Sequence, residues 1–337
     1  MPQPKPNEGN GKGLRQDSGK EKEPLLANNI FWEERTVPAP SYVQLGAEEV
    51  ARRAAAAREK LRACNLCPHR CGVNRLAGEK GKCRAGAEAL VASYGPHFGE
   101  EAVLVGRYGS GTIFFAYCNL RCVFCQNCEL SWGGEGYPVD ADELARIMLA
   151  LQQKRCHNVN LVTPTHFVPQ ILAALARAIP QGLSLPLVYN CGGYEALETL
   201  ALLERIVDIY MPDFKYTAAE PARRYSGAPG YPEHVKAALK EMHRQVGDLV
   251  IDAEGLAVRG LLVRHLVLPA NLAGTREAME FIARELSPDT FVNLMAQYFP
   301  AHEAWRHPPL DRRLTAQEYA EALAAARAAG LKRAGRW

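Results

Sequence analysis

The most informative stretch of this chain covers residues 117–127 and reads Tyr-Cys-Asn-Leu-Arg-Cys-Val-Phe-Cys-Gln-Asn. It places Cys118, Cys122 and Cys125 at the spacing C-x3-C-x2-C. Thiolates are the usual ligands of iron–sulfur clusters, and a closed [4Fe–4S] cluster takes four of them. Three thiolates on one short loop would bind three irons and leave the fourth open to a small molecule. The loop therefore favours an enzyme over a structural metal site, which closes its shell with protein ligands.

Size and composition set the outer bounds on function. The chain has 337 residues, of which 47% are apolar and 23% charged, with a formal net charge of +3. These values are ordinary for a globular domain. The near-neutral balance predicts no nucleic-acid partner and no attraction to an anionic membrane, and no apolar run is long enough to span a bilayer. The first thirty residues lack the apolar core of a signal peptide, so we expect a cytoplasmic protein.

Ten cysteines in a cytoplasmic chain indicate metal sites rather than disulfides, because a reducing compartment keeps thiols free. Eight of them fall in two clusters, over residues 64–83 and 118–128. The first cluster follows C-x2-C-x3-C-x11-C and consists of Cys64, Cys67, Cys71 and Cys83. Four thiols at this spacing predict a metal without saying which one. Zinc would fold the loop, whereas an auxiliary iron–sulfur cluster would relay electrons or touch substrate.

Cys128 leaves an alternative open at the main loop. Together with Cys122 and Cys125 it forms C-x2-C-x2-C, a spacing found in bacterial ferredoxins. If Cys128 completed the shell, the open iron would be lost and the chain would be an electron carrier. We expect instead a free, small buried thiol, because an unligated cysteine behaves as a small hydrophobe.

After residue 109 the chain alternates short apolar strands with helical segments. Strands are expected over 112–115, 159–162, 187–190, 208–211, 262–268 and 291–294. Helices are expected over 46–63, 141–154, 167–179, 194–205, 276–286 and 316–329, with further helical segments to about residue 245. Six βα units in one run predict an α/β fold with a partial parallel (β/α)6 barrel. The expected domains are a disordered tail over 1–28, a helix and cysteine-rich extension over 29–108, and the barrel over 109–337.

In such barrels the chemistry lies in the loops that follow the carboxyl ends of the strands. That rule turns the strand list into a list of candidate site segments. The segments are polar or glycine-rich and comprise residues 118–125, 163–166, 190–193, 213–215, 269–271 and 297–298.

The segment 117–132 resembles the cluster loop of radical S-adenosylmethionine (radical SAM) enzymes, specifically pyruvate formate-lyase activating enzymes and their relatives. The shared part is Cys-Asn-Leu-Arg-Cys-x-Phe-Cys-Gln-Asn, followed by Ser131-Trp132. The resemblance runs from Cys64 to the C-terminus. The four N-terminal cysteines resemble an extra motif carried by an uncharacterised branch of these relatives.

The resemblance implies a cofactor pair and a reaction. Cys118, Cys122 and Cys125 would bind a [4Fe–4S] cluster whose open iron binds S-adenosylmethionine. One electron then cleaves that molecule into methionine and a 5′-deoxyadenosyl radical, which abstracts hydrogen from a glycine of a partner glycyl radical enzyme. A reduced flavodoxin or a ferredoxin-type protein is the implied electron donor.

The resemblance also implies contacts with the cofactor. Phe124 would lie near the adenine. Asp213 and Lys215 match an Asp-x-Lys pair that lies against the carboxylate and sugar. A surface ion pair is the alternative, and the position at a strand end favours the functional role. Asn190 matches the third-strand loop, and the strand residue Arg264 would meet the carboxylate if it faced inward.

Two segments depart from the resembled pattern. The activating enzymes carry Gly-Gly-Glu where this chain has Thr163-Pro164-Thr165. Thr163 and Thr165 are the candidates to replace its oxygens, with helix capping by Thr165 as the alternative. At the sixth strand a cofactor-contacting histidine is shifted or absent, so Gln297 and Tyr298 are the candidates there.

Three functions remain open from the sequence. The first is a glycyl-radical-enzyme activase, and the second is a radical SAM enzyme with a peptide or small-molecule substrate. The third is an iron–sulfur electron-transfer protein, which requires Cys128 to bind iron.

Overall fold

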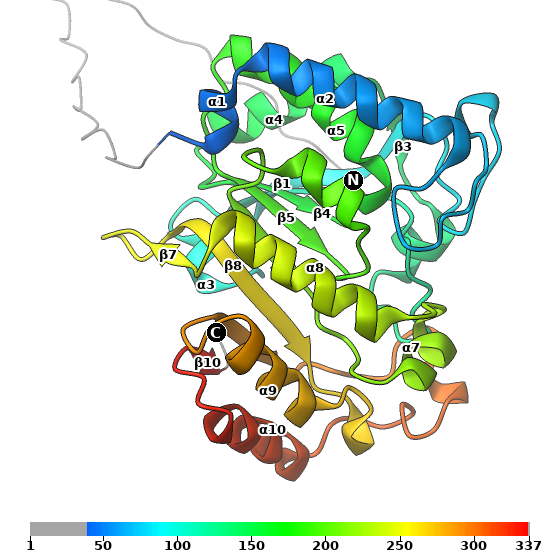
Figure 1. Ribbon diagram of the computed structural model, residues 1–337, viewed down its shortest axis with the longest axis vertical. Coiled ribbons are helices and arrows are strands. Elements are labelled where there is room, and N and C mark those ends of the chain that lie inside the picture. The colour runs from blue at the N-terminus through cyan, green and yellow to red at the C-terminus, as the bar shows by residue number, and fades with distance from the viewer. Residues whose placement is uncertain (1–38, 336–337) are drawn as a thin grey trace, which may run out of the picture. The chain divides into compact units, whose positions relative to one another are not determined.

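One ten-stranded sheet runs through residues 39–335, the part of the chain that the computed structural model describes (Figure 1). The tail expected over residues 1–28 lies outside this part. The strands are β1 (Ala89–His97), β2 (Ser110–Phe115), β3 (Tyr137–Val139), β4 (Val159–Val162), β5 (Leu187–Cys191), β6 (Ile209–Pro212), β7 (Val250–Ile251), β8 (Ala257–Leu266), β9 (Phe291–Met295) and β10 (Ala334–Gly335). Their order across the sheet is β10-β9-β8-β6-β5-β4-β2-β1-β3, with β7 paired to β8.

The six strands expected from the sequence are all present, and each is parallel to the next. They run β2-β4-β5-β6-β8-β9 across the sheet. Registers are regular at the centre, where Leu161 lies opposite Ile113 on one side and Tyr189 on the other. An α/β fold with a mostly parallel sheet is therefore confirmed, and it is consistent with a partial barrel.

Helices follow most of these strands. They are α1 (Ser41–Leu45), α2 (Ala47–Glu59), α3 (Ala102–Val105), α4 (Ala141–Gln153), α5 (Val168–Ala178), α6 (Leu197–Leu200), α7 (Ala219–Ser226), α8 (Tyr231–Val246), α9 (Thr275–Glu285) and α10 (Ala316–Ala328). Short 3₁₀ helices cover η1 (Lys60–Ala63), η2 (Arg75–Ala77), η4 (Thr165–Phe167), η5 (Ile179–Gln181), η6 (Ala201–Leu203), η7 (Pro269–Asn271) and η8 (Ala304–Arg306), and η3 (Glu129–Gly133) is a π-helix.

Local sequence explains where the longer helices form. Asp140 caps α4, because its side chain accepts a hydrogen bond from the backbone N–H of Glu143. The buried face of α4 is apolar, and α2 packs on α5 through small alanines. Figure 1 shows α2, α4 and α5 gathered on one side of the strands β4 and β5, with α9 and α10 at the opposite end.

The helix expected over residues 194–205 was too long. Only α6 and the short η6 form there, and residue Ala196 before α6 is extended. The preceding residues bind other segments instead of starting a helix. The carbonyl of Tyr194 accepts a hydrogen bond from Asn119, and Glu195 accepts hydrogen bonds from Thr165 and Tyr189.

The antiparallel strand β1 was not expected from the sequence. It pairs with β2 on one side and β3 on the other, and it contains Gly95 and Pro96, which are unfavourable within strands. β1 lies in the segment expected as an extension, over 29–108, yet it joins the sheet of the barrel segment. The described residues form one compact unit.

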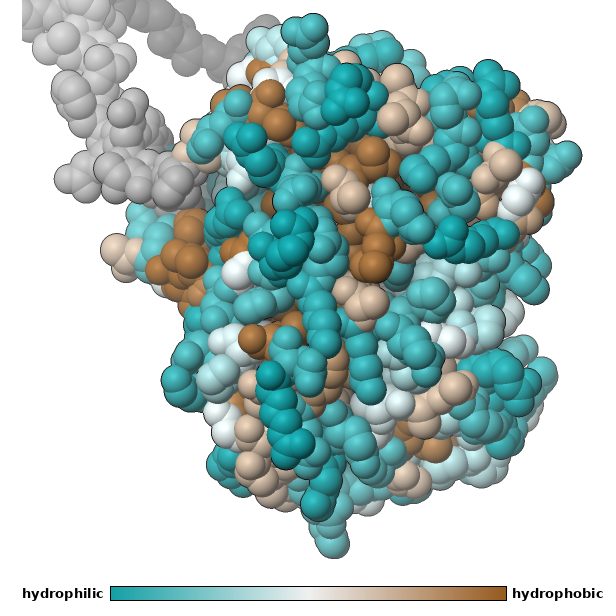
Figure 2. Space-filling view, in the orientation of Figure 1, coloured by the Kyte–Doolittle hydropathy of each residue, from teal (hydrophilic) through white to brown (hydrophobic). Residues whose placement is uncertain are grey.

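The strands at the centre of the sheet are covered on both faces. Every residue of β5 and β6 is buried, as is typical of parallel strands between helices. The face in Figure 2 is mostly hydrophilic, with small separate apolar patches. Within residues 39–335 no helix is both long and apolar enough to cross a membrane.

Candidate functional site

The three cysteines of the main loop line one cavity at the carboxyl ends of the parallel strands. Cys118, Cys122 and Cys125 face a hollow of about 170 Å³ whose other walls come from the ends of β2, β4, β5 and β6. A neighbouring hollow of about 240 Å³ continues it. The two share a set of lining residues: Cys122, Cys125, Asn127, Asp213, Lys215 and Arg264.

Each of the three sulfurs has a hydrogen-bond partner. The backbone N–H of Leu120 lies 3.3 Å from Cys118 Sγ, and the hydroxyl of Ser226 donates to Cys122 Sγ at 3.0 Å. Cys125 Sγ lies 3.0 Å from the hydroxyl of Ser131. Burial is the main cause that raises the pKa of the free Cys122 thiol to about 11, while Lys215 and the Ser226 hydrogen bond act in the opposite direction and favour the thiolate that a metal requires.

The cysteine loop is held by neighbouring segments through its backbone. The N–H groups of Arg121 and Val123 donate to carbonyls at the end of α7, each at 2.8 Å. The carbonyl of Val123 accepts from the N–H of Glu303, and the indole of Trp132 donates to the carbonyl of Cys122 at 3.3 Å. These bonds fix the loop without occupying the cysteine sulfurs.

A cluster of charged side chains with little exposure lines the same cavity as the thiols. Asp213 accepts hydrogen bonds from Lys215 Nζ at 2.6 Å and from Arg264 Nε at 2.8 Å. Arg264 also donates to Asn190 Oδ1 at 2.7 Å, and Glu100 lies 3.6 Å from its Nη1. The side chains of Asp213 and Lys215 are only 12% and 16% exposed, so the reading of them as a surface ion pair is wrong.

The charges in this cluster stabilise one another. Burial would raise the pKa of Asp213, but Arg264 and Lys215 outweigh it and hold that pKa below its usual range. Burial would lower the pKa of Lys215, yet Asp213 raises it above its usual value. All three groups are therefore ionised near neutral pH, and the site presents both an acceptor and donors to a ligand.

Tyr231, which the sequence did not single out, holds the strand ends together. Its hydroxyl accepts from the N–H of Lys215 at 2.9 Å and lies 2.9 Å and 2.7 Å from the carbonyls of Gly192 and Asp213. Gly193 permits this packing, since its φ is +76° and a Cβ there would lie 2.4 Å from the carbonyl of Asp213. No local signal marks a tyrosine at the start of α8 for this role.

Thr163 and Thr165 are placed differently. Thr163 lines the cavity and adopts φ +60°, an unusual backbone for a β-branched residue and one that often marks a functional position. Thr165 is fully buried, and its hydroxyl donates to Glu195 at 2.7 Å. The structure therefore does not bring Thr165 to either hollow, and its side chain makes no capping bond either.

The remaining candidates lie around the second hollow. Phe124 and Gln297 line it, and Gln126 Nε2 lies 3.5 Å from the carbonyl of Gln297. Tyr298 does not line it: its hydroxyl donates to Leu310, while its ring packs edge-on against Phe124 at 5.9 Å. Tyr298 thus lies behind Phe124 and supports it.

Cys128 lies outside both hollows. It is partly exposed rather than buried, which corrects the expectation of a buried thiol. Three cysteines therefore line the cavity as possible metal ligands, and Cys128 is not positioned to be a fourth.

Two histidines near the strand ends, His265 and His166, are core residues. His265 is fully buried, with its ring nitrogens 2.7 Å from the carbonyl of Phe214 and 3.0 Å from the hydroxyl of Thr275. Burial lowers the pKa of His265 to about 4. His166 lies 2.9 Å from the carbonyl of Ala116 through Nε2, and burial lowers its pKa to about 3.

The second cysteine set lies together in space. Cys64, Cys67, Cys71 and Cys83 line one small cavity, which Arg75 and His166 also line. Within residues 39–335, no three His, Cys, Asp or Glu side chains are gathered closely enough to hold one metal ion between them. A [4Fe–4S] cluster binds its thiolates through separate irons, and both cysteine sets offer the thiol ligands that such clusters take.

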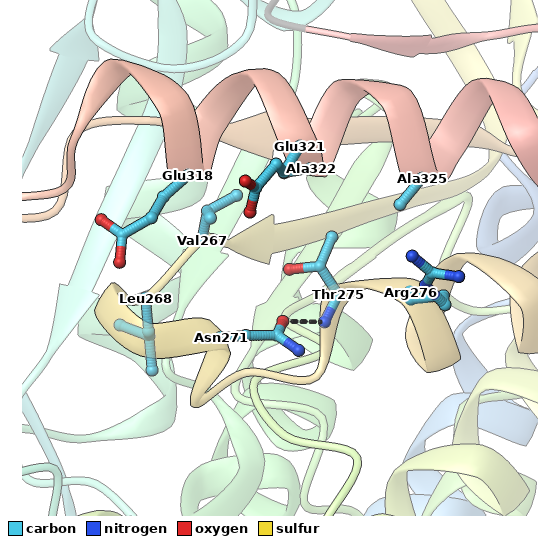
Figure 3. A pocket seen from close by; sticks show the side chains of 9 residues that line it. All are labelled: Val267, Leu268, Asn271, Thr275, Arg276, Glu318, Glu321, Ala322 and Ala325. Carbon is cyan, nitrogen blue, oxygen red and sulfur yellow. Dashed lines mark hydrogen bonds between the residues drawn. The ribbon is translucent and has the colours of Figure 1, made fainter.

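A further cavity lies away from the cysteines, between the end of β8 and helices α9 and α10 (Figure 3). Figure 3 shows Asn271 bonded to the N–H of Thr275 and Glu318 projecting from α10. Glu318 is engaged by Arg312 and by the N–H of Ala270. The residues that line this cavity include no cysteine and no histidine.

Comparisons with known proteins agree with the geometry. A model of the Radical SAM superfamily matches residues 112–253, which include the main cysteine loop and the strand ends up to Lys215. The uncharacterized protein MJ0674 of Methanocaldococcus jannaschii is 35% identical over 272 residues, covering 77% of this chain and 73% of that protein. The name of that relative assigns no substrate.

Proposed function

Since this chain belongs to the radical SAM superfamily, we propose that Cys118, Cys122 and Cys125 bind a [4Fe–4S] cluster whose open iron takes S-adenosylmethionine. The observation that supports this assignment is that these three thiols share a cavity with Asp213 and Arg264, whereas Cys128 lies outside it. When bound, the cluster and S-adenosylmethionine supply a 5′-deoxyadenosyl radical that abstracts hydrogen from a substrate.

The charged cluster suits the amino-acid end of S-adenosylmethionine. Asp213 offers carboxylate oxygens to an ammonium group, and Lys215 and Arg264 offer donors to a carboxylate. Because these groups already hold one another in place, they bind the ligand with little loss of side-chain freedom. Asn190 keeps the Arg264 guanidinium oriented towards the cavity edge.

The second hollow suits the adenosine end. Phe124 offers an aromatic surface for a base, and Gln297 lines the same wall with polar groups. Tyr298 holds the Phe124 ring in position from behind. Thr163, at the neighbouring strand end, lines the cavity and is the residue that would offer oxygens in place of the missing Gly-Gly-Glu segment.

The substrate we propose is a glycine of a glycyl radical enzyme, which would make the chain an activase similar to pyruvate formate-lyase activating enzymes. A peptide or small-molecule substrate is the alternative within the same chemistry. The proposed setting is the cytoplasm, with a reduced flavodoxin or a ferredoxin-type protein as electron donor. This part rests on the resemblance of the cysteine loop and of Asp213-Phe214-Lys215.

Two measurements test the proposal in order. The anaerobically reconstituted chain, given dithionite and S-adenosylmethionine, should release 5′-deoxyadenosine, and Cys122→Ala should abolish the release. A glycyl radical protein from the same genome should then gain an EPR doublet only when this chain is added. Release without any doublet would reject the activase assignment and favour the peptide or small-molecule alternative.

A further inference from the structure

We propose that Cys64, Cys67, Cys71 and Cys83 bind a second iron–sulfur cluster, and that this cluster is the port through which an acidic reduced protein delivers electrons. The inference rests on the proposed function, because an electron port has a purpose only if the Cys118 loop uses electrons. Four observations on described residues support it: a buried cation, an unpartnered histidine nitrogen, hydrogen bonds between the two cysteine loops, and a basic rim.

The buried cation is Arg75. Its side chain is 1% exposed, and it donates to the carbonyls of Gly86 and His166 and lies 4.0 Å from Cys64 Sγ. Within residues 39–335 no carboxylate forms a salt bridge with it. A buried charge requires a counter-charge, and carbonyl groups do not provide a full one. Four thiolates bound to a metal centre would supply that negative charge next to the guanidinium.

The unpartnered atom is Nδ1 of His166. Nε2 of this ring lies 2.9 Å from the carbonyl of Ala116, so Nε2 carries the proton and Nδ1 carries a lone pair. Nδ1 is buried without a hydrogen-bond partner, and His166 is among the residues that line the same cavity as the four thiols. An unsatisfied buried polar atom is costly, which indicates that the cavity is built for a group that completes it.

Hydrogen bonds join the two cysteine loops next to their cysteines. His69, two residues after Cys67, lies 2.9 Å from the carbonyl of Asn119, which follows Cys118. Arg121 donates to the carbonyl of Lys82 at 3.1 Å, and these two residues adjoin Cys122 and Cys83. The first of these contacts connects the two thiol sets through covalent bonds and a single hydrogen bond. Zinc has no redox chemistry that could use such a path, so the arrangement favours iron and sulfide.

The rim of this site is basic and exposed. Lys80, Lys82 and Arg84 are exposed on the segment that ends the second set, and Glu79 is the acidic residue among them. A cationic surface over a redox centre attracts an acidic partner and speeds its association. The partner that fits is an acidic flavodoxin or ferredoxin rather than a nucleic acid, since the chain as a whole carries only +3.

The electron count of the proposed step is simple. The donor protein is oxidised by one electron, and the second cluster is reduced by one. The electron then moves towards the Cys118 loop along the His69–Asn119 contact, with no bond broken and no proton transferred.

The experiment compares two reductants on one set of variants. Anaerobic wild-type chain should contain about eight irons and negligible zinc, and Cys64→Ala/Cys67→Ala should contain about four. With dithionite, which reaches the main site directly, the double variant should release 5′-deoxyadenosine at a rate within twofold of wild type. With a purified acidic flavodoxin, reduced photochemically, its rate should fall at least tenfold.

A second variant keeps the test independent of folding at the cysteines. Lys80→Glu/Lys82→Glu/Arg84→Glu should raise the flavodoxin concentration for half-maximal rate several-fold and leave the dithionite rate unchanged. The matched control replaces three exposed arginines elsewhere by glutamate, Arg52, Arg284 and Arg327. It should leave the flavodoxin concentration for half-maximal rate and the dithionite rate unchanged.

The outcomes separate the two proposals. Zinc in place of the extra iron, or an undiminished flavodoxin rate in both the double and the triple variant, would overturn the electron port. A wild-type chain with about eight irons that never cleaves S-adenosylmethionine would instead overturn the proposed function, while iron content and the EPR signal of the reduced second cluster would still establish the second site.

Discussion

Arg264 on β8 and Asp213 at the end of β6 form a buried ion pair, with Nε and Oδ1 2.8 Å apart, at the edge of the cysteine-lined cavity. The pair links two neighbouring parallel strands, whose backbones also form a bridge at these two residues. A charged ligand that binds this pair would therefore contact residues of two adjacent strands at once.

Asp213→Asn should weaken the binding of S-adenosylmethionine by about 10- to 100-fold, since a hydrogen bond to a charged group contributes about 1.5–3 kcal/mol. Anaerobic equilibrium dialysis with the reconstituted chain measures the dissociation constant of S-adenosylmethionine. The control is Asp289→Asn. Asp289 is an exposed carboxylate that pairs with Lys332 and lines neither hollow. Equal affinity in the two variants would show that Asp213 does not contact the ligand.

Cys128→Ala should retain the cluster and its reactivity, because Cys128 lies outside both hollows. Cys125→Ala should lose most of the iron bound at this loop, because Cys125 lines both. Iron and sulfide analysis, together with the visible absorption of the cluster, compares the cluster content of the two variants. Loss of the cluster in Cys128→Ala would instead support the electron-carrier alternative.

Ser226→Ala should make the reduction potential of the main cluster more negative by on the order of tens of millivolts. The Ser226 hydroxyl donates to Cys122 Sγ, and hydrogen bonds to cluster sulfurs stabilise the more negative, reduced state. EPR-monitored redox titration gives the potential. Ser110→Ala, a buried serine that bonds Asn158 instead, should leave it unchanged. A shift of the same size in both variants would contradict a specific role for Ser226.

Glu318→Gln should lower the free energy of unfolding by about 1 kcal/mol at neutral pH, as for loss of a helix cap. Glu318 completes a capping box with Thr315, and Arg312 is the main reason that the pKa of Glu318 lies below its usual range. A lowered folded pKa stabilises the fold above the unfolded value of about 4.3, and this contribution is lost as the pH falls through the folded value.

The measurement is urea unfolding of the metal-free chain at pH 7 and at pH 3. The difference in the free energy of unfolding between wild type and Glu318→Gln should be larger at pH 7 than at pH 3. Glu321→Gln on the same helix, whose carboxylate accepts a hydrogen bond from Gln317, should lower the free energy of unfolding by less at both pH values. A difference that grows on acidification would contradict the assigned sign.

Much of the fold could be predicted from the sequence, because parallel strands buried on both faces appear as short apolar runs. The segments 159–162 and 291–294 were found within one residue of β4 and β9. β1 was missed because Gly95 and Pro96 mask a strand whose stability comes from its partners β2 and β3. Pairing between distant segments overrides local preference there.

The site residues that could be predicted are those whose type is fixed by the chemistry. Residues that reach the site through packing could not be predicted. The cysteines of the main loop and the Asp213–Lys215 pair stand out in sequence, and the structure brings them to one cavity. Tyr231 and Ser226 did not stand out, because a hydroxyl that reaches a strand end or a sulfur leaves no local pattern. Thr165 was misplaced for a related reason: its partner Glu195 is thirty residues away.

The most direct test of the account is electron–nuclear double resonance on the reduced, anaerobically reconstituted chain with isotopically labelled S-adenosylmethionine. If the cluster held by Cys118, Cys122 and Cys125 has an open iron, the spectra should show hyperfine coupling from the amino nitrogen and the carboxylate oxygen of the ligand. A cluster with four protein sulfur ligands and no coupling to either label would contradict it.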